Sequence, residues 1–65
     1  MTGQFAIWAR GRDGRWSVIH YTADRARAER IARGTAQSDP RVTRCEVRRD
    51  GEVVYTTGPA EARDA

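Results

Sequence analysis

Hydrophobic and polar residues alternate with a period of two in four short stretches of this chain, and they follow a helical period in one stretch between them. The alternating stretches span residues 5–10, 15–21, 42–48 and 52–57, and each contains β-branched or aromatic residues that favour strands. Residues 23–37 place small apolar side chains on one side and charged side chains on the other. The pattern therefore predicts four strands and one amphipathic helix.

Two glycine-containing turns separate the strands within each pair. The first is Gly11-Arg12-Asp13-Gly14 and the second is Arg49-Asp50-Gly51. Asp-Gly between alternating apolar runs indicates a hairpin, because glycine adopts the positive φ that the turn needs and Asp bonds to nearby backbone. We expect both loops to contain three residues and to close with a left-handed glycine.

This expected register sorts the strand residues onto two faces, and a slip of one residue would exchange them. The predicted pairs are Arg10–Trp16, Trp8–Val18 and Ile7–Ile19 in the first hairpin, and Arg48–Glu52, Val47–Val53 and Cys45–Tyr55 in the second. The residues expected beneath the helix are Phe5, Ile7, Ala9, Ile19, Tyr21, Cys45, Val47, Val53 and Tyr55. Those expected on the other face are Trp8, Arg10, Trp16, Val18, His20, Arg44, Glu46, Arg48, Glu52 and Val54.

Signals at both ends of the helical stretch set its expected boundaries. Thr22 is predicted to be the N-cap, with Asp24 favourably placed near the positive end of the helix. Gly34 either ends the helix or lies in its interior. Glu29 and Arg33 have the i,i+4 spacing of an ion pair. The side expected to pack on the sheet carries Ala28, Ile31, Ala32 and Thr35.

These elements predict an α+β fold: a single small ββαββ domain over residues 4–58, in which a four-stranded, mainly antiparallel sheet carries one helix on one face. Residues 1–3 and 59–65 are expected to be flexible termini. The strand order stays open; strands two and three would be parallel, with a right-handed crossover, if they were neighbours. A chain of 65 residues without leucine has a thin core, so a dimer interface or a bound partner would add stability.

Charge and cysteine content narrow the classes of partner and compartment. All twelve basic residues are arginine, and against nine carboxylates they give a net charge of +3, which attracts polyanions. A GC-rich genome would also favour arginine over lysine. Cys45 is the single cysteine, residues 1–4 lack the features of a leader, and no apolar run approaches the length of about 20 that crosses a bilayer. We expect a cytoplasmic protein that does not bind membranes.

Catalytic and metal-binding patterns are not found in the sequence. His20 is the only imidazole, Cys45 is expected on the opposite face, and the carboxylates are spread among turns and the helix surface. We therefore predict no catalytic residue, no metal, no cofactor and no enzymatic activity. Residues 11–14 have the spacing of the GxxG loop of KH modules, but here they join two strands, which leaves a hairpin whose exposed Arg12 could contact a phosphate.

Tryptophan and arginine interleave on the face that the helix is not expected to cover. The candidate binding residues are Trp8, Arg10, Trp16, Arg44 and Arg48. Such residues stack on bases and neutralise phosphates in single-strand binders, and they are also enriched at protein interfaces. Two hypotheses follow: a non-catalytic nucleic-acid-binding or accessory regulatory protein, or a protein–protein module, either a homodimer that buries the tryptophans or a small bacterial or phage inhibitor or adaptor. A third interpretation lays the tryptophans over arginine stems to complete the core.

The order of elements resembles that of short bacterial ββαββ proteins of unknown function. The resemblance rests on Arg15-Trp16-Ser17-Val18 and Arg49-Asp50-Gly51-Glu52 and covers residues 5–57. The charged stretch 44–49 departs from the more apolar strand expected there. The resemblance implies a fold and no activity.

Overall fold

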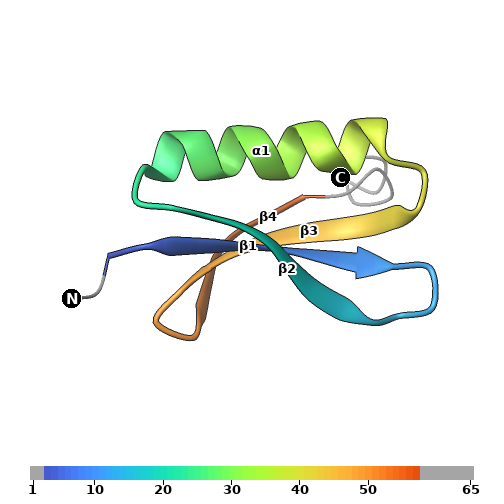
Figure 1. Cartoon of the computed structure of the whole chain (residues 1–65), viewed down its shortest axis with the longest axis horizontal. Helices are drawn as coiled ribbons and strands as arrows, with labels where there is room; N and C mark the ends of the chain where they lie inside the picture. Colours follow the sequence, from blue (N-terminus) through green and yellow to red (C-terminus); the bar gives the residue numbers. More distant parts are fainter. Residues whose placement is uncertain (1–2, 58–65) are drawn as a thin grey trace.

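A computed structural model describes residues 3–57 of the chain and shows a sheet with a helix across one of its faces (Figure 1). The elements are β1 (Phe5–Gly11), β2 (Trp16–Thr22), α1 (Arg25–Ser38), β3 (Val42–Arg49) and β4 (Glu52–Thr57). All strand pairs are antiparallel, and the order across the sheet is β2-β1-β3-β4. The predicted α+β class and ββαββ layout are confirmed. The expectation of flexible termini falls, apart from Gly3, on residues outside the described range.

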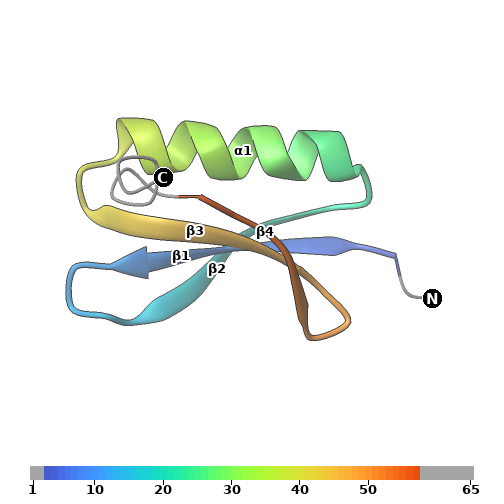
Figure 2. The same ribbon diagram turned by 180° about the vertical axis from the view of Figure 1, so that it is seen from behind.

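The central strands come from opposite halves of the sequence. β1 pairs with β3 from Ala6 opposite Arg48 to Arg10 opposite Arg44, so the two hairpins join through their first strands. β2 and β3 are not neighbours, and the parallel pairing considered for them does not occur. The helix packs mainly against β1 and β3 and lies along one side of the sheet in both views (Figures 1 and 2). β2 and β4 are therefore the two edges.

The first hairpin has the predicted loop but contains an irregularity that the pattern does not reveal. Gly14 has a φ of +84°, and the Gly11 amide donates to the carbonyl of Arg15 at 2.9 Å, which closes a three-residue loop. The predicted pairs Arg10–Trp16 and Trp8–Val18 are confirmed. A β-bulge then places Ile7 opposite His20 and leaves Ile19 unpaired, so the predicted Ile7–Ile19 pair is wrong.

The second hairpin has a shorter loop than predicted. Asp50 and Gly51 both have positive φ, 52° and 83°, as in a two-residue turn, and Asp is one of the few residues that tolerate this conformation. Arg49 consequently faces Glu52, and a second bulge follows between Val47 and Arg48. The predicted pairs Arg48–Glu52, Val47–Val53 and Cys45–Tyr55 are wrong; the observed ones are Arg48–Val53, Val47–Tyr55 and Cys45–Thr57.

The core is small and built largely from alanine. Its buried residues are Phe5, Ile7, Ala9, Ala28, Ala32, Ala36, Cys45 and Val47, with Ile31, Val42, Val54 and Tyr55 packed partly against them. Three residues expected in the core are exposed instead: Ile19 by 44%, Tyr21 by 57% and Val53 by 50%. Ile19 is the extra residue of the bulge, and Tyr21 and Val53 pair with Ala6 and Arg48, which point away from the helix.

The helix begins two residues later than the sequence predicted. Asp24 is the N-cap, and its Oδ1 accepts a hydrogen bond from the amide of Arg27 at 3.2 Å. Thr22 is not the cap; its hydroxyl accepts from the amide of Asp24, which holds the turn that leads into the helix. Either residue type can cap a helix, and the geometry of the connection from β2 selects the second.

The structure also decides the role of Gly34 and the ion-pair partner of Glu29. The helix continues through Gly34 to Ser38, and the amide of its C-cap, Asp39, donates to the carbonyl of Thr35, so the glycine is interior. Glu29 forms its ion pair with Arg25, at 3.0 Å, and not with Arg33. The packing side matches the pattern, since Ala28, Ala32 and Ala36 are the buried residues of α1.

Replacing Asp24 by Ala is expected to lower the free energy of unfolding by about 1 kcal/mol, because the amide of Arg27 loses its acceptor at the helix start. Urea denaturation followed by circular dichroism measures the change. Thr22→Ala is the matched control and should cost less, since its hydroxyl accepts from an amide outside the helix. A larger loss for Thr22→Ala than for Asp24→Ala would contradict the observed cap.

Candidate interaction surface on the open face of the sheet

The sheet face opposite α1, which we call the open face, is defined by the strand register. Residues that alternate with the buried ones, and their partners on neighbouring strands, point to this side. They are Ala6, Trp8, Arg10, Trp16, Val18, Tyr21, Arg44, Glu46, Arg48, Val53 and Thr56. Within residues 3–57, no element covers this face (Figures 1 and 2).

All five residues predicted to bind a partner lie on the open face: Trp8, Arg10, Trp16, Arg44 and Arg48. Three other residues assigned there by the sequence do not belong to it, because the bulge in β2, the shorter second turn and the bulge in β4 each shift the register. His20 faces the buried Ile7, Glu52 faces Arg49, and Val54 packs against the core. Tyr21 and Val53 take their place, and the sequence reasoning missed both.

Arg48 is the centre of a cluster on this face. Its Nε and Nη2 donate to Oε1 of Glu46 at 2.9 and 2.7 Å. Its Cζ lies 4.7 Å from the ring centroid of Trp8 and 5.2 Å from that of Trp16, within cation–π range. We call these four residues the Trp–Arg–Glu cluster.

Partial burial strengthens the interactions inside the Trp–Arg–Glu cluster. The Glu46 side chain is 13% exposed and that of Arg48 is 30% exposed, so water screens their attraction less than at an open surface. Both tryptophans are half-buried. The indole rings thus contact the Arg48 guanidinium, and a carboxylate balances the charge of this arginine.

Exposed apolar and basic residues surround the cluster. Val18, Tyr21 and Val53 are 37%, 57% and 50% exposed, respectively. Arg10 is exposed and faces the half-buried Arg44 across the β1–β3 pair, so one end of the open face carries two adjacent positive charges. The surface combines an apolar rim, a centre in which Glu46 balances Arg48, and an end at which two arginines lie on neighbouring strands.

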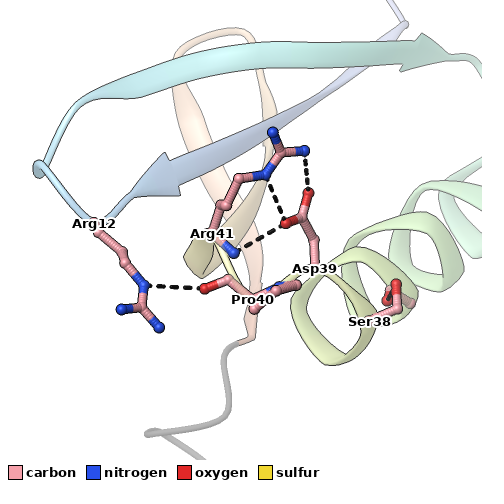
Figure 3. A network of polar contacts seen from close by, with 6 residues as sticks. Arg12, Ser38, Asp39, Pro40 and Arg41 are labelled. Atoms are coloured by element: carbon pink, nitrogen blue, oxygen red, sulfur yellow. Dashed lines mark hydrogen bonds and ion pairs between the residues drawn. The ribbon is translucent and has the colours of Figure 1, made fainter.

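A groove of about 700 Å³ lies near the C-terminal end of α1, and its lining includes Arg12 and residues 36–40. Figure 3 shows the polar contacts beside it: Nε of Arg12 donates to the Pro40 carbonyl at 3.1 Å, and the Arg41 amide and Nε donate to Oδ1 of Asp39 at 2.9 and 3.2 Å. The side-chain hydrogen bond from Arg41 lowers the pKa of Asp39. These hydrogen bonds stabilise the connection from α1 to β3. One of them uses Nε of Arg12, so this nitrogen is already bonded to the Pro40 carbonyl.

The single cysteine and the single histidine of the sequence lie in different surroundings. Cys45 is fully buried in the core, and this burial raises the pKa of its thiol, as does the negative charge of Asp39. His20 is exposed on the edge strand β2. Among residues 3–57, no three His, Cys, Asp or Glu side chains gather as metal ligands would. In the same part of the chain, α1 is too short and too polar to cross a membrane.

Comparison with known proteins adds no relative: no family model, no curated protein and no solved structure matches this chain. The similarity to short bacterial ββαββ proteins therefore stays a prediction.

Proposed function

We propose that this chain is a small non-catalytic module that binds a protein partner through the open face of its sheet. The observation that carries this proposal is the one-sided helix cover, which leaves the Trp–Arg–Glu cluster in the middle of a face with exposed apolar side chains around it. Tryptophan, tyrosine and arginine dominate the binding energy of protein interfaces. The cytoplasm, predicted from the sequence, is the compartment we propose for it.

The state of Arg48 favours a protein over a nucleic acid as the partner. Single-strand binders stack bases on free aromatic faces and neutralise phosphates with free cations. Here both indole rings contact Arg48, and Glu46 balances its charge. A partner with apolar side chains would instead cover Val18, Tyr21 and Val53 without breaking the cluster.

Nucleic-acid binding is the second candidate, and the net charge of +3 together with the facing arginines Arg10 and Arg44 favours it. An accessory regulatory role would follow from such binding. This mode predicts an affinity that falls steeply with salt, because bound phosphates release counterions. Contacts to the apolar rim would depend little on salt.

Site-specific photocrosslinking in the native host tests the two candidates. A benzophenone amino acid replaces Val53, an exposed residue of the open face, or in the control Arg30, an exposed residue of α1. We expect a discrete protein adduct from position 53 and none from position 30. Equal adducts at both positions, or no adduct at position 53, would overturn the proposal.

The chain's own tryptophans test the second candidate in solution, because both lie on the open face. Their emission is followed while a mixed-sequence DNA or RNA oligonucleotide is added at low and at physiological salt. A salt-sensitive change would assign the open face to nucleic acid and contradict the protein proposal. We expect unchanged emission at physiological salt.

A further inference from the structure

We propose that β2 is a dimerisation edge at which a second copy of this chain pairs antiparallel with the first, giving a continuous sheet of eight strands. This inference concerns the edge of the sheet and does not depend on the function proposed for the open face. β2 ends the sheet in the described part of the chain.

The composition of β2 is unusual for an edge strand. Its sequence, Trp16-Ser-Val-Ile-His-Tyr-Thr22, contains no Asp, Glu, Lys, Arg, Pro or Gly. Natural sheets protect exposed edges with charges, prolines, bulges or covering loops, because a long apolar edge pairs with other strands. β2 has only the bulge at Ile19, and β4 contains a bulge as well, so the two edges differ in the other devices. Of the four large hydrophobic side chains that are exposed among the described residues, Val18, Ile19 and Tyr21 lie on β2.

The opposite edge, β4, is better protected. It begins with the charged Glu52, and its Val54 and Tyr55 are partly buried against the core. The Arg25 side chain reaches from α1 and donates through Nη2 to the carbonyl of Val54 at 3.2 Å. β2 is therefore the edge open to a further strand.

The backbone of β2 offers hydrogen-bonding groups to such a strand. The amide of Gly11 donates to the carbonyl of Arg15, which makes these residues a hydrogen-bonded pair at the end of the hairpin. Pairs in an antiparallel ladder alternate, so the amides and carbonyls of Trp16 and Val18 point away from β1. A two-fold axis lets two identical edges exchange the same set of bonds.

The absence of charged residues from β2 and the small core of the monomer both favour a second copy of this chain as the strand that pairs with β2. The chain is basic overall, yet two β2 strands meet without placing like charges opposite one another. Four of the eight buried core residues are alanine, so the monomer buries little apolar volume for its size. Pairing of two β2 strands would bring their apolar side chains beside one another and add buried apolar area at the edge.

Pairing through β2 determines where the helices and the open faces of the two copies lie. Antiparallel strands side by side are related by a two-fold axis perpendicular to the sheet, so both helices lie on the same side. The two open faces then form one surface on the other side. A dimer of this kind leaves each Trp–Arg–Glu cluster available to a partner.

Sedimentation velocity from micromolar to millimolar concentration tests the proposal. We expect the wild type to dimerise, Ile19→Lys to weaken dimerisation at least tenfold by placing positive charges near the axis, and Val53→Lys to dimerise as the wild type does. The control changes an equally exposed apolar residue on the other edge strand. Circular dichroism verifies that both variants fold.

Amide exchange of the wild type supplies a second readout that needs no variant. The amides of Trp16 and Val18 should exchange more slowly as the dimer forms. A wild type that stays monomeric, unchanged exchange at these amides, or equal weakening by Val53→Lys would overturn the proposal. Crosslinking of another protein at position 53 would persist in Ile19→Lys, so failure of the dimer and failure of the open-face function are distinguishable.

Discussion

Replacement of Ile7 by Ala is expected to lower the free energy of unfolding by about 3 kcal/mol, a large fraction of the stability of so small a domain. Ile7 is fully buried at the centre of β1, opposite Val47 on the neighbouring strand. Its side chain faces a helix surface made of alanines, which cannot extend to fill the cavity. Urea denaturation followed by circular dichroism measures the loss.

Ile19→Ala is the matched control for this prediction. Ile19 is 44% exposed and unpaired at the bulge of β2, so its loss should change the free energy of unfolding by less than about 0.5 kcal/mol. Both variants are compared at a concentration low enough to keep the chain monomeric. Equal losses for the two isoleucines would mean that the bulge is misplaced and that Ile19 belongs to the core.

Glu46→Gln is expected to lower the free energy of unfolding by about 1–2 kcal/mol, because the half-buried guanidinium of Arg48 loses its charged acceptor while the side-chain volume is kept. Tryptophan emission should shift as well, since Arg48 contacts both indole rings. Thermal unfolding and fluorescence spectra measure the two effects.

The control for Glu46→Gln is Glu29→Gln on the helix. Its partner Arg25 is 56% exposed, and i,i+4 pairs of this kind contribute about 0.3–0.5 kcal/mol. Tryptophan emission should not change, because the helix lies on the other side of the sheet. If both variants lose the same stability, the Trp–Arg–Glu cluster does not stabilise the open face.

Local chemistry made much of the fold predictable from the sequence. Asp-Gly turns located both hairpins, and the period of the alanines located the helix and its packing side. The first loop was correct in length because a single left-handed glycine, Gly14, closes it. The second differed because Asp50 also adopts a positive φ, which shortens the loop by one residue.

The bulges could not be predicted, since an extra residue leaves the alternating pattern looking regular. Each bulge exchanges the faces of every residue beyond it. Ile19 and Tyr21 are therefore not in the core, although they were predicted there. Val53 is not in the core because the second turn is one residue shorter than predicted, which places Val53 opposite Arg48.

The sequence predicted which residues lie at the candidate site but not which of them contact one another. Trp8 and Arg48 lie on the central strands, Trp16 begins the edge strand β2, and all three were assigned to the correct face. The contact of Arg48 with both rings depends on side-chain directions that no spacing rule supplies. One signal was present: Glu46 and Arg48, two apart on one strand, carry opposite charges on the same face.

The pairing of β1 with β3 determines when this domain can fold during synthesis. The first hairpin and the helix leave the ribosome without the strand that completes their shared core, because Ile7 and Ala9 pair with Val47 and Cys45. An isolated two-stranded hairpin is marginally stable in water. The nascent chain therefore completes its shared core only after β3 has emerged from the ribosome, and until then β2, which contains no Asp, Glu, Lys or Arg, lacks the finished sheet beside it.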